Sequence, residues 1–392
     1  FGAALCLLLF GLFFTRKLYR MNLITLGDFF KVRYGRKTEL IAAFFLFPPY
    51  IGYIAAQLVA MGLVLHVVTG METFNGVVLS AVIVTFYTYT GGMWAISITD
   101  FIQGILIVVG LLVLAWVLGT KSGGIFAVID QMPSEDLRFL PEFDFYEIAA
   151  WIAAWSVLGI GSIPSQDVFQ RVMSSGSEKI AVRSCFYAAG LYLTIAMIPL
   201  FISLCTKILY PDHLAGDLQL VLPRMVIEHT SIGVQVLFFG SLLSAIMSTT
   251  SSAILAPASI LSENIVRPLW KNSLSDKNLL QVTRLGILVV SIAATVMATM
   301  RSNIYELVGE SSIISMVSLF SPMVFGLYWN RASAKGAIAS MITGTVSWII
   351  FIQLETSVPD FLLATMVSLG TLVLVSIIPQ NRNQYLGRVG SI

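Results

Sequence analysis

Residues 97–119 read SITDFIQGILIVVGLLVLAWVLG and carry one charged side chain, that of Asp100. A helix that crosses a bilayer needs about 20 mainly apolar residues, and this run meets that length. The same criterion marks ten further runs, at 1–18, 38–66, 74–90, 146–173, 180–207, 231–265, 280–300, 304–328, 335–354 and 360–379. The sequence therefore predicts an all-α, polytopic membrane protein with about eleven membrane helices.

The composition of the whole chain agrees with this prediction. Hydrophobic residues make up 57% of the 392 residues and charged residues only 11%, where a soluble chain carries about 25% charge. The formal net charge of +2 argues against nucleic acid as a partner. The three cysteines and three histidines lack metal-ligand spacing, and no catalytic or nucleotide-binding motif is present. We therefore expect that the protein is not an enzyme and that it holds no cofactor and no structural metal.

The distribution of basic residues predicts an orientation. When the chain is threaded alternately through the membrane, 18 of the 23 Lys and Arg residues fall on one side. Cytoplasmic loops retain positive charge, so this side is assigned to the cytoplasm. The chain start is then external, and the C-terminus is cytoplasmic in a protein of the cytoplasmic (plasma) membrane. The long polar connections around 121–142 and 210–230 fall outside.

The apolar run 237–266 is unusually rich in hydroxyl side chains. Ser244, Ser248, Ser251 and Ser252 recur at helical spacing and share one face. Hydroxyl oxygens with nearby carbonyls can replace part of the water shell of a monovalent cation. Serine on a membrane helix also lets two helix backbones pack closely. The pattern by itself leaves both interpretations open.

Asp100 is a second polar feature of a membrane segment, and Gln103 lies one turn further along the same helical face. The carboxylate of Asp100 suits a helix N-terminus, where it accepts hydrogen bonds from backbone amides. A carboxylate that enters the membrane is costly, however, and commonly marks an ion pathway. Asp100 is therefore a candidate either for a cap or for drawing in a cation.

The run 155–171, WSVLGIGSIPSQDVFQR, combines Gly159, Gly161 and Pro164 within a membrane segment. These residues weaken the backbone hydrogen-bond ladder, which indicates a kink or a broken helix. Secondary transporters often build a midplane site from such a break. Aromatic residues nearby, including Tyr50 and Tyr53, can stack on a solute or simply pack between helices.

Four motifs in this order resemble the sodium:solute symporter family. They are the stretch from Gly91-Gly92 to Gln103, the stretch Gln166-Asp167-Val168-Phe169-Gln170-Arg171, the helix from Ala245 to Ser252, and the stretch from Tyr328-Trp329-Asn330-Arg331 to Ala337. The resemblance implies a LeuT-type fold with two inverted five-helix repeats. It also implies sodium-coupled symport, with Na⁺ as the coupling ion, of a small organic solute such as an amino acid, a quaternary amine or a sugar-like molecule.

The resemblance assigns site residues to two groups. The common sodium site would use the backbone carbonyl of Ala245 and the hydroxyls of Ser248 and Thr249. A second sodium ion would use Asp100, Ser251 and Ser252 with Ser248. The substrate or gate candidates are Tyr53, Trp155, Ser165, Gln166 and Phe169.

The chain departs from the family in one respect. The two membrane helices that usually precede the one beginning at Phe1 are missing, so we interpret 1–392 as a single transporter domain that is N-terminally incomplete. The run 155–170 would then be the inverted partner of a missing broken helix. A solute sensor, a proton-coupled transporter and an uncoupled transporter or channel remain alternatives.

Overall fold

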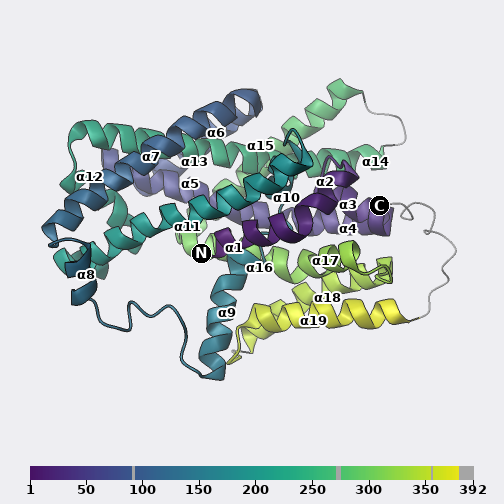
Figure 1. Cartoon of the computed structure of the whole chain (residues 1–392). Helices are drawn as coiled ribbons and strands as arrows, with labels where there is room; N and C mark the ends of the chain where they lie inside the picture. Colours follow the sequence, from purple (N-terminus) through teal and green to yellow (C-terminus); the bar gives the residue numbers. More distant parts are fainter. Residues whose placement is uncertain (91–92, 271–274, 355, 379–392) are drawn as a thin grey trace.

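The computed structural model of the chain describes residues 1–90, 93–270, 275–354 and 356–378, and side chains throughout these ranges except at 93–99. Every regular element within these ranges is helical (Figure 1). The all-α prediction is therefore confirmed. Three of the 18 Lys and Arg residues that were assigned to the cytoplasmic side, Lys271, Arg382 and Arg388, lie outside the described residues.

The helices have well-defined bounds. In the first half these are α1 Gly2–Leu9, α2 Thr15–Met21, α3 Leu26–Tyr34, α4 Arg36–Leu46, α5 Pro48–Thr69, α6 Thr73–Thr90, α7 Met93–Lys121, α8 Ile125–Gln131, α9 Phe145–Gly159 and α10 Gln166–Met173. In the second half they are α11 Glu178–Leu209, α12 Val221–His229, α13 Ile232–Ile260, α14 Arg267–Leu269, α15 Asp276–Met300, α16 Ile304–Ser315, α17 Ser321–Tyr328, α18 Ala334–Gln353 and α19 Asp360–Ile377. Short 3₁₀ turns, Pro211–Ala215 and Leu218–Leu220, precede α12.

Ten helical stretches in the described ranges are long and apolar enough to cross a membrane. They are Gly2–Met21, Arg36–Thr69, Thr73–Thr90, Asp100–Lys121, Glu178–Leu209, Ile232–Leu269, Asp276–Met300, Ile304–Tyr328, Ala334–Gln353 and Asp360–Ile377. Three of them contain a π-helical turn, at Phe10–Phe14, Leu261–Val266 and Met316–Phe320. Such turns are often found at functional sites.

The eleventh predicted span, 146–173, is not one helix. It consists of α9 and α10, joined by an irregular stretch at 160–165, so the predicted break is confirmed. The backbone of Gly161 passes so close to the carbonyl of Ser312 in α16 that a Cβ would lie 2.5 Å from that oxygen. Pro164, which lacks an N–H, follows within the break. The helix is thus interrupted at the point where glycine allows the backbone of α16 to approach closely.

Polar caps and prolines fix several other helix ends. Thr25 forms a capping box with Asp28 at the start of α3, and Ser177 caps α11. Pro48 begins α5 directly after α4 ends, as expected for a residue that cannot continue the hydrogen-bond ladder. The Pro48-Pro49 pair therefore divides the long span into α4 and α5.

Small residues allow the long helices to pack closely, which is how membrane helices associate when lipid is as apolar as the core. The central helix α5 packs against α6, α13, α15 and α16. Gly62 of α5 faces Gly76 of α6, where a Cβ would meet the Gly62 carbonyl oxygen at 3.0 Å. The helices α18 and α19 lie side by side along one edge of the bundle, at the bottom of Figure 1. The helix α13 also packs against α7 and α10, which brings these three helices together at the candidate site.

Candidate functional site

The candidate ion site lies between α7 and α13, which run antiparallel. Lys121 contacts His229 just before α13, Gly110 lies against the Phe238 ring, and Gln103 reaches Ser244. In these three contacts the residue number on α7 decreases as the residue number on α13 increases. Residues one turn before Gln103 therefore face residues one turn after Ser244. Asp100 and Ser248 are therefore brought to the same level.

Three polar atoms at this junction are buried and have no hydrogen-bond partner among the described residues: Asp100 Oδ1, Gln103 Oε1 and Ser248 Oγ. Buried polar groups are normally paired, and leaving one unpaired costs free energy. All three are oxygens, the ligand type that hard cations prefer. One carboxylate oxygen and two neutral oxygens on two facing helices make a ligand set that suits a monovalent cation.

The other predicted sodium ligands lie along the same stretch of α13. Ser248 and Ser251 are buried, and Ala245, Thr249 and Ser252 are half-buried. Thr250, on another face of α13, has its hydroxyl satisfied by the Ile246 carbonyl at 2.6 Å. The motif that begins at Gly91-Gly92 lies partly outside the described residues, and only its part from Asp100 onward contributes to this geometry.

The break between α9 and α10 places two predicted residues at the start of α10. The hydroxyl of Ser165 donates to the Ser162 carbonyl at 2.7 Å and so stabilises the turn. Gln166 is fully buried, and its Oε1 accepts a hydrogen bond from the Leu26 amide at 2.6 Å. Its Nε2 has no partner among the described residues. Gln166 therefore joins α10 to α3 and keeps one unused donor.

Tyr50 and Asp167, which the sequence did not pair, connect α5 to α10. The Tyr50 hydroxyl donates to Asp167 Oδ1 at 3.1 Å and accepts from the Asp167 amide at 3.1 Å. A carboxylate in a membrane segment is costly unless it is paired, and the tyrosine supplies that partner here. Asp167 was visible in the sequence as an acidic residue directly after the break.

The aromatic candidates do not converge on one site. Trp155 belongs to an aromatic cluster with Phe1, Phe139 and Trp151, with ring centroids 5.3–5.9 Å from its own. Phe169 is 1% exposed and packs in an apolar core, whereas Tyr53 is half-buried beside the core around α5. The packing interpretation thus accounts for the positions of Trp155 and Phe169.

A buried polar network at the other end of α13 was missed in the sequence. Asn264, in the π-helical turn, is 0% exposed and donates to Asp28 Oδ1 at 3.2 Å and to Glu39 Oε1 at 2.8 Å. Its Oδ1 accepts from the Thr25 hydroxyl at 2.9 Å, and its carbonyl accepts from Arg36. The network joins α13 to α3 and α4. An asparagine after the serine-rich stretch was the only signal.

The fourth motif forms the connection between α17 and α18. Arg33 of α3 donates to the carbonyls of Gly326, Trp329 and Ala332, at 2.9, 3.0 and 3.1 Å. Ser333 caps α18 through the Gly336 amide. The motif therefore serves to hold α3 against the end of α17.

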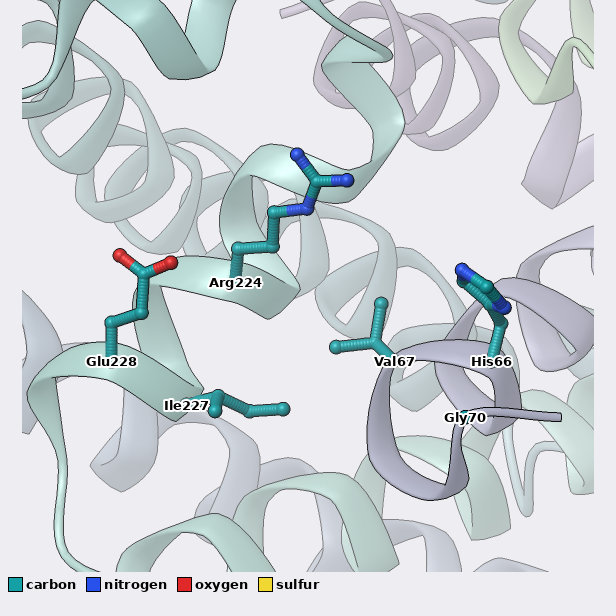
Figure 2. A pocket seen from close by; sticks show the side chains of 6 residues that line it. All are labelled: His66, Val67, Gly70, Arg224, Ile227 and Glu228. Carbon is teal, nitrogen blue, oxygen red and sulfur yellow. The ribbon is translucent and has the colours of Figure 1, made fainter.

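Two pockets lie away from the predicted ion ligands. One, of about 320 Å³, lies between the end of α5 and α12 and is lined by His66, Val67, Gly70, Arg224, Ile227 and Glu228 (Figure 2). The other, of about 380 Å³, has an apolar lining that includes Ile160 and Ile163 of the break. The second pocket places an apolar surface beside the opened backbone.

Comparison with known proteins gives consistent matches. The chain is 27% identical over 356 residues to the high affinity choline transporter 1 of Homo sapiens, over 88% of this chain and 61% of the relative. It is 29% identical to the high-affinity proline transporter PutP of Bacillus subtilis (strain 168), over 93% of this chain and 78% of the relative. The chain thus spans less than two thirds of the length of the choline transporter.

A solved structure of a Na⁺-coupled sialic acid symporter in a substrate-bound, outward-open state matches the fold with a TM-score of 0.78. The match covers 96% of this chain and 82% of that chain, at 20% identity. The predicted LeuT-type fold is thereby confirmed, and the chain is an integral membrane protein. Because the model of the family described as "Sodium:solute symporter family" matches residues 1–344, the chain belongs to the sodium:solute symporter family.

Proposed function

We propose that this protein carries out sodium-coupled symport of a small polar organic solute across the cytoplasmic membrane by alternating access. The observation that carries the proposal is the set of buried oxygens of Asp100, Gln103 and Ser248, on α7 and α13, that have no hydrogen-bond partner in the described part of the chain. Ala245, Ser248 and Thr249 would hold the common sodium ion. Asp100, Ser251 and Ser252 would hold a second ion with Ser248.

The donor set fits sodium as the transported ion. Hydroxyl, amide and carboxylate oxygens replace the hydration shell of a hard monovalent cation, and one carboxylate balances its single charge. Coupling requires that ion and solute stabilise the same conformation, so that each raises the affinity for the other. No covalent step or cofactor is needed.

The solute would bind beside the break between α9 and α10. There the backbone is opened, and Gln166 Nε2 is a buried donor without a partner among the residues that the structure describes. Tyr53 lies one turn along α5 from Tyr50, which bonds Asp167 at the start of α10. The candidate solutes are choline and proline, which the names of the relatives give, and sialic acid, which the name of the solved structure gives. We propose a solute of the amino acid or quaternary amine class, because Tyr53 can hold a cationic group over its ring.

The proposed orientation places the C-terminus in the cytoplasm, following the distribution of Lys and Arg. The network around Asn264 and the cap of α3 would then lie on the cytoplasmic side, and α12 on the external side. Labelling of single cysteines placed in the 121–142 connection and in the 22–25 connection between α2 and α3, with a membrane-impermeant reagent, tests this. The first must react from outside and the second only after the membrane is opened.

Uptake into vesicles tests the proposed transport. The intact protein in sealed liposomes is given radiolabelled choline, proline or sialic acid with an inward gradient of sodium, of potassium, or of protons. We expect accumulation of one of them against its gradient only with sodium. Downhill flux without any cation gradient indicates an uncoupled transporter or channel. Binding of a solute without transport indicates a sensor.

A further inference from the structure

The side-chain amide of Gln103 contacts the opposite helix. Its Nε2 donates to Ser244 Oγ at 2.6 Å, which leaves Oε1 as the buried end without a partner among the described residues. A buried carbonyl oxygen without a donor is unfavourable unless another group, such as a cation, satisfies it. No described side chain or backbone group satisfies this oxygen, so it is available to a ligand.

The neighbours of this oxygen indicate what that ligand is. Asp100 lies three residues earlier on α7, and Ser248 lies four residues after Ser244 on α13, so both lie about one helical turn toward the same end of the bundle. Asp100 Oδ1 and Ser248 Oγ are also buried and unpaired among the described residues. A carboxylate oxygen with two neutral oxygens attracts a cation, not an anion or an apolar group.

We propose that Gln103 is a direct ligand of the sodium ion that Asp100 and Ser248 share, with Ser244 as its positioning residue. This inference rests on the proposed sodium coupling and adds a residue to it. Gln103 and Ser244 lie closer than Asp100 and Ser248 to the C-terminal end of α7 at Lys121. An ion that enters from that end therefore meets the amide oxygen before the carboxylate. The amide then contributes to the choice between cations, because ligand type and field strength set selectivity.

Binding of ²²Na⁺ to the purified intact protein tests the inference without a solute. The variant Gln103→Met keeps the length of the side chain but has no carbonyl, and we expect its sodium Kd to rise about tenfold or more, as for loss of an interaction with a charged group. Ser244→Ala removes only the orienting contact and should raise the Kd less. Gln103→Glu should still bind sodium but favour Li⁺ more than the parent does, since a carboxylate has the stronger field.

Thr250→Val is the matched control, because Thr250 lies on the same helix with its hydroxyl already bonded to the Ile246 carbonyl. Its sodium Kd should equal that of the parent. A Kd within twofold of the parent for folded Gln103→Met, or an unchanged Li⁺/Na⁺ ratio in Gln103→Glu, overturns the assignment of Gln103 alone. Absence of ²²Na⁺ binding in the parent overturns the proposed coupling together with it. If Gln103→Met does not fold, the Gln103→Glu and Ser244→Ala results decide.

Discussion

Tyr50 and Asp167 are joined by two hydrogen bonds, in which the tyrosine hydroxyl donates to the carboxylate and accepts from the backbone amide of the same aspartate. The pair ties the start of α5 to the first turn of α10, directly after the break in the membrane segment. Movement of α10 relative to α5 must therefore break both bonds. Loss of the pair should therefore destabilise the contact between α5 and the broken helix.

Tyr50→Phe removes both hydrogen bonds and leaves a carboxylate oxygen and an amide without their partner. We expect a loss of about 1–3 kcal/mol in stability, seen as a lower unfolding temperature in detergent. Tyr53→Phe is the control, one turn away on the same helix, and should change stability less. Equal unfolding temperatures for the parent and Tyr50→Phe would show that the pair contributes nothing.

Asn264→Asp tests the buried network at the end of α13. The substitution removes both amide donors and places a third carboxyl group against Asp28 and Glu39, so we expect a large loss of stability, about 3 kcal/mol or more. Asn264→Ala should cost less, because it adds no charge. Glu263→Gln, which affects only the exposed pair with Arg267, should change little. A ranking in which Asn264→Asp is the mildest change would contradict this account.

Gly344→Ala tests the packing of α18 against the π-helical turn at Met316–Phe320. A Cβ at Gly344 would clash with the Val317 carbonyl and lie 2.9 Å from the Ser368 Cβ. We expect destabilisation by about 1–3 kcal/mol, since overpacking forces backbone shifts. Gly370→Ala in the adjacent α19 has open space and should be neutral or slightly stabilising. Thermal unfolding of the two variants side by side measures the difference.

His229, in α12 outside the membrane-spanning helices, predicts a pH dependence. Burial lowers the pKa of its imidazole below the usual 6.5, Lys121 and His213 lower it further, and Glu228 opposes them. The unfolded chain then binds the proton more readily, so stability declines as the pH falls below 6.5 and recovers as it rises. The unfolding temperature of the parent should drop more between pH 7.5 and 5.5 than that of His229→Gln. Parallel curves for the two proteins would remove His229 as the cause.

The sequence predicted the fold well because long apolar runs and Gly-Pro interruptions act locally. The break at Gly161 and Pro164 was predicted from residue type, whereas the run 38–66, which was predicted as a single span, is divided at Pro48. The serine face of α13 was likewise visible as a helical period. The partner of Ser244 was not, because Gln103 is 141 residues away and only the antiparallel packing of α7 and α13 brings them together.

Other parts of the site could not be predicted for a related reason. The sequence does not show in which direction an aromatic side chain near a break points. In the structure Phe169 packs in the apolar core, and Trp155 stacks with Phe1. Asn264 resembles any polar residue at a helix end until four groups from α3, its N-cap and α4 surround it. These roles depend on contacts across the bundle, which a single sequence does not contain.

The sodium dependence of solute uptake by Ser248→Ala/Thr249→Ala in liposomes tests most directly whether hydroxyl groups of α13 hold the driving ion. We predict that the sodium concentration for half-maximal uptake rises about tenfold or more while the unfolding temperature stays close to that of the parent, because two ion ligands but no core contacts are lost. A sodium activation curve that superimposes on that of the parent would contradict the account.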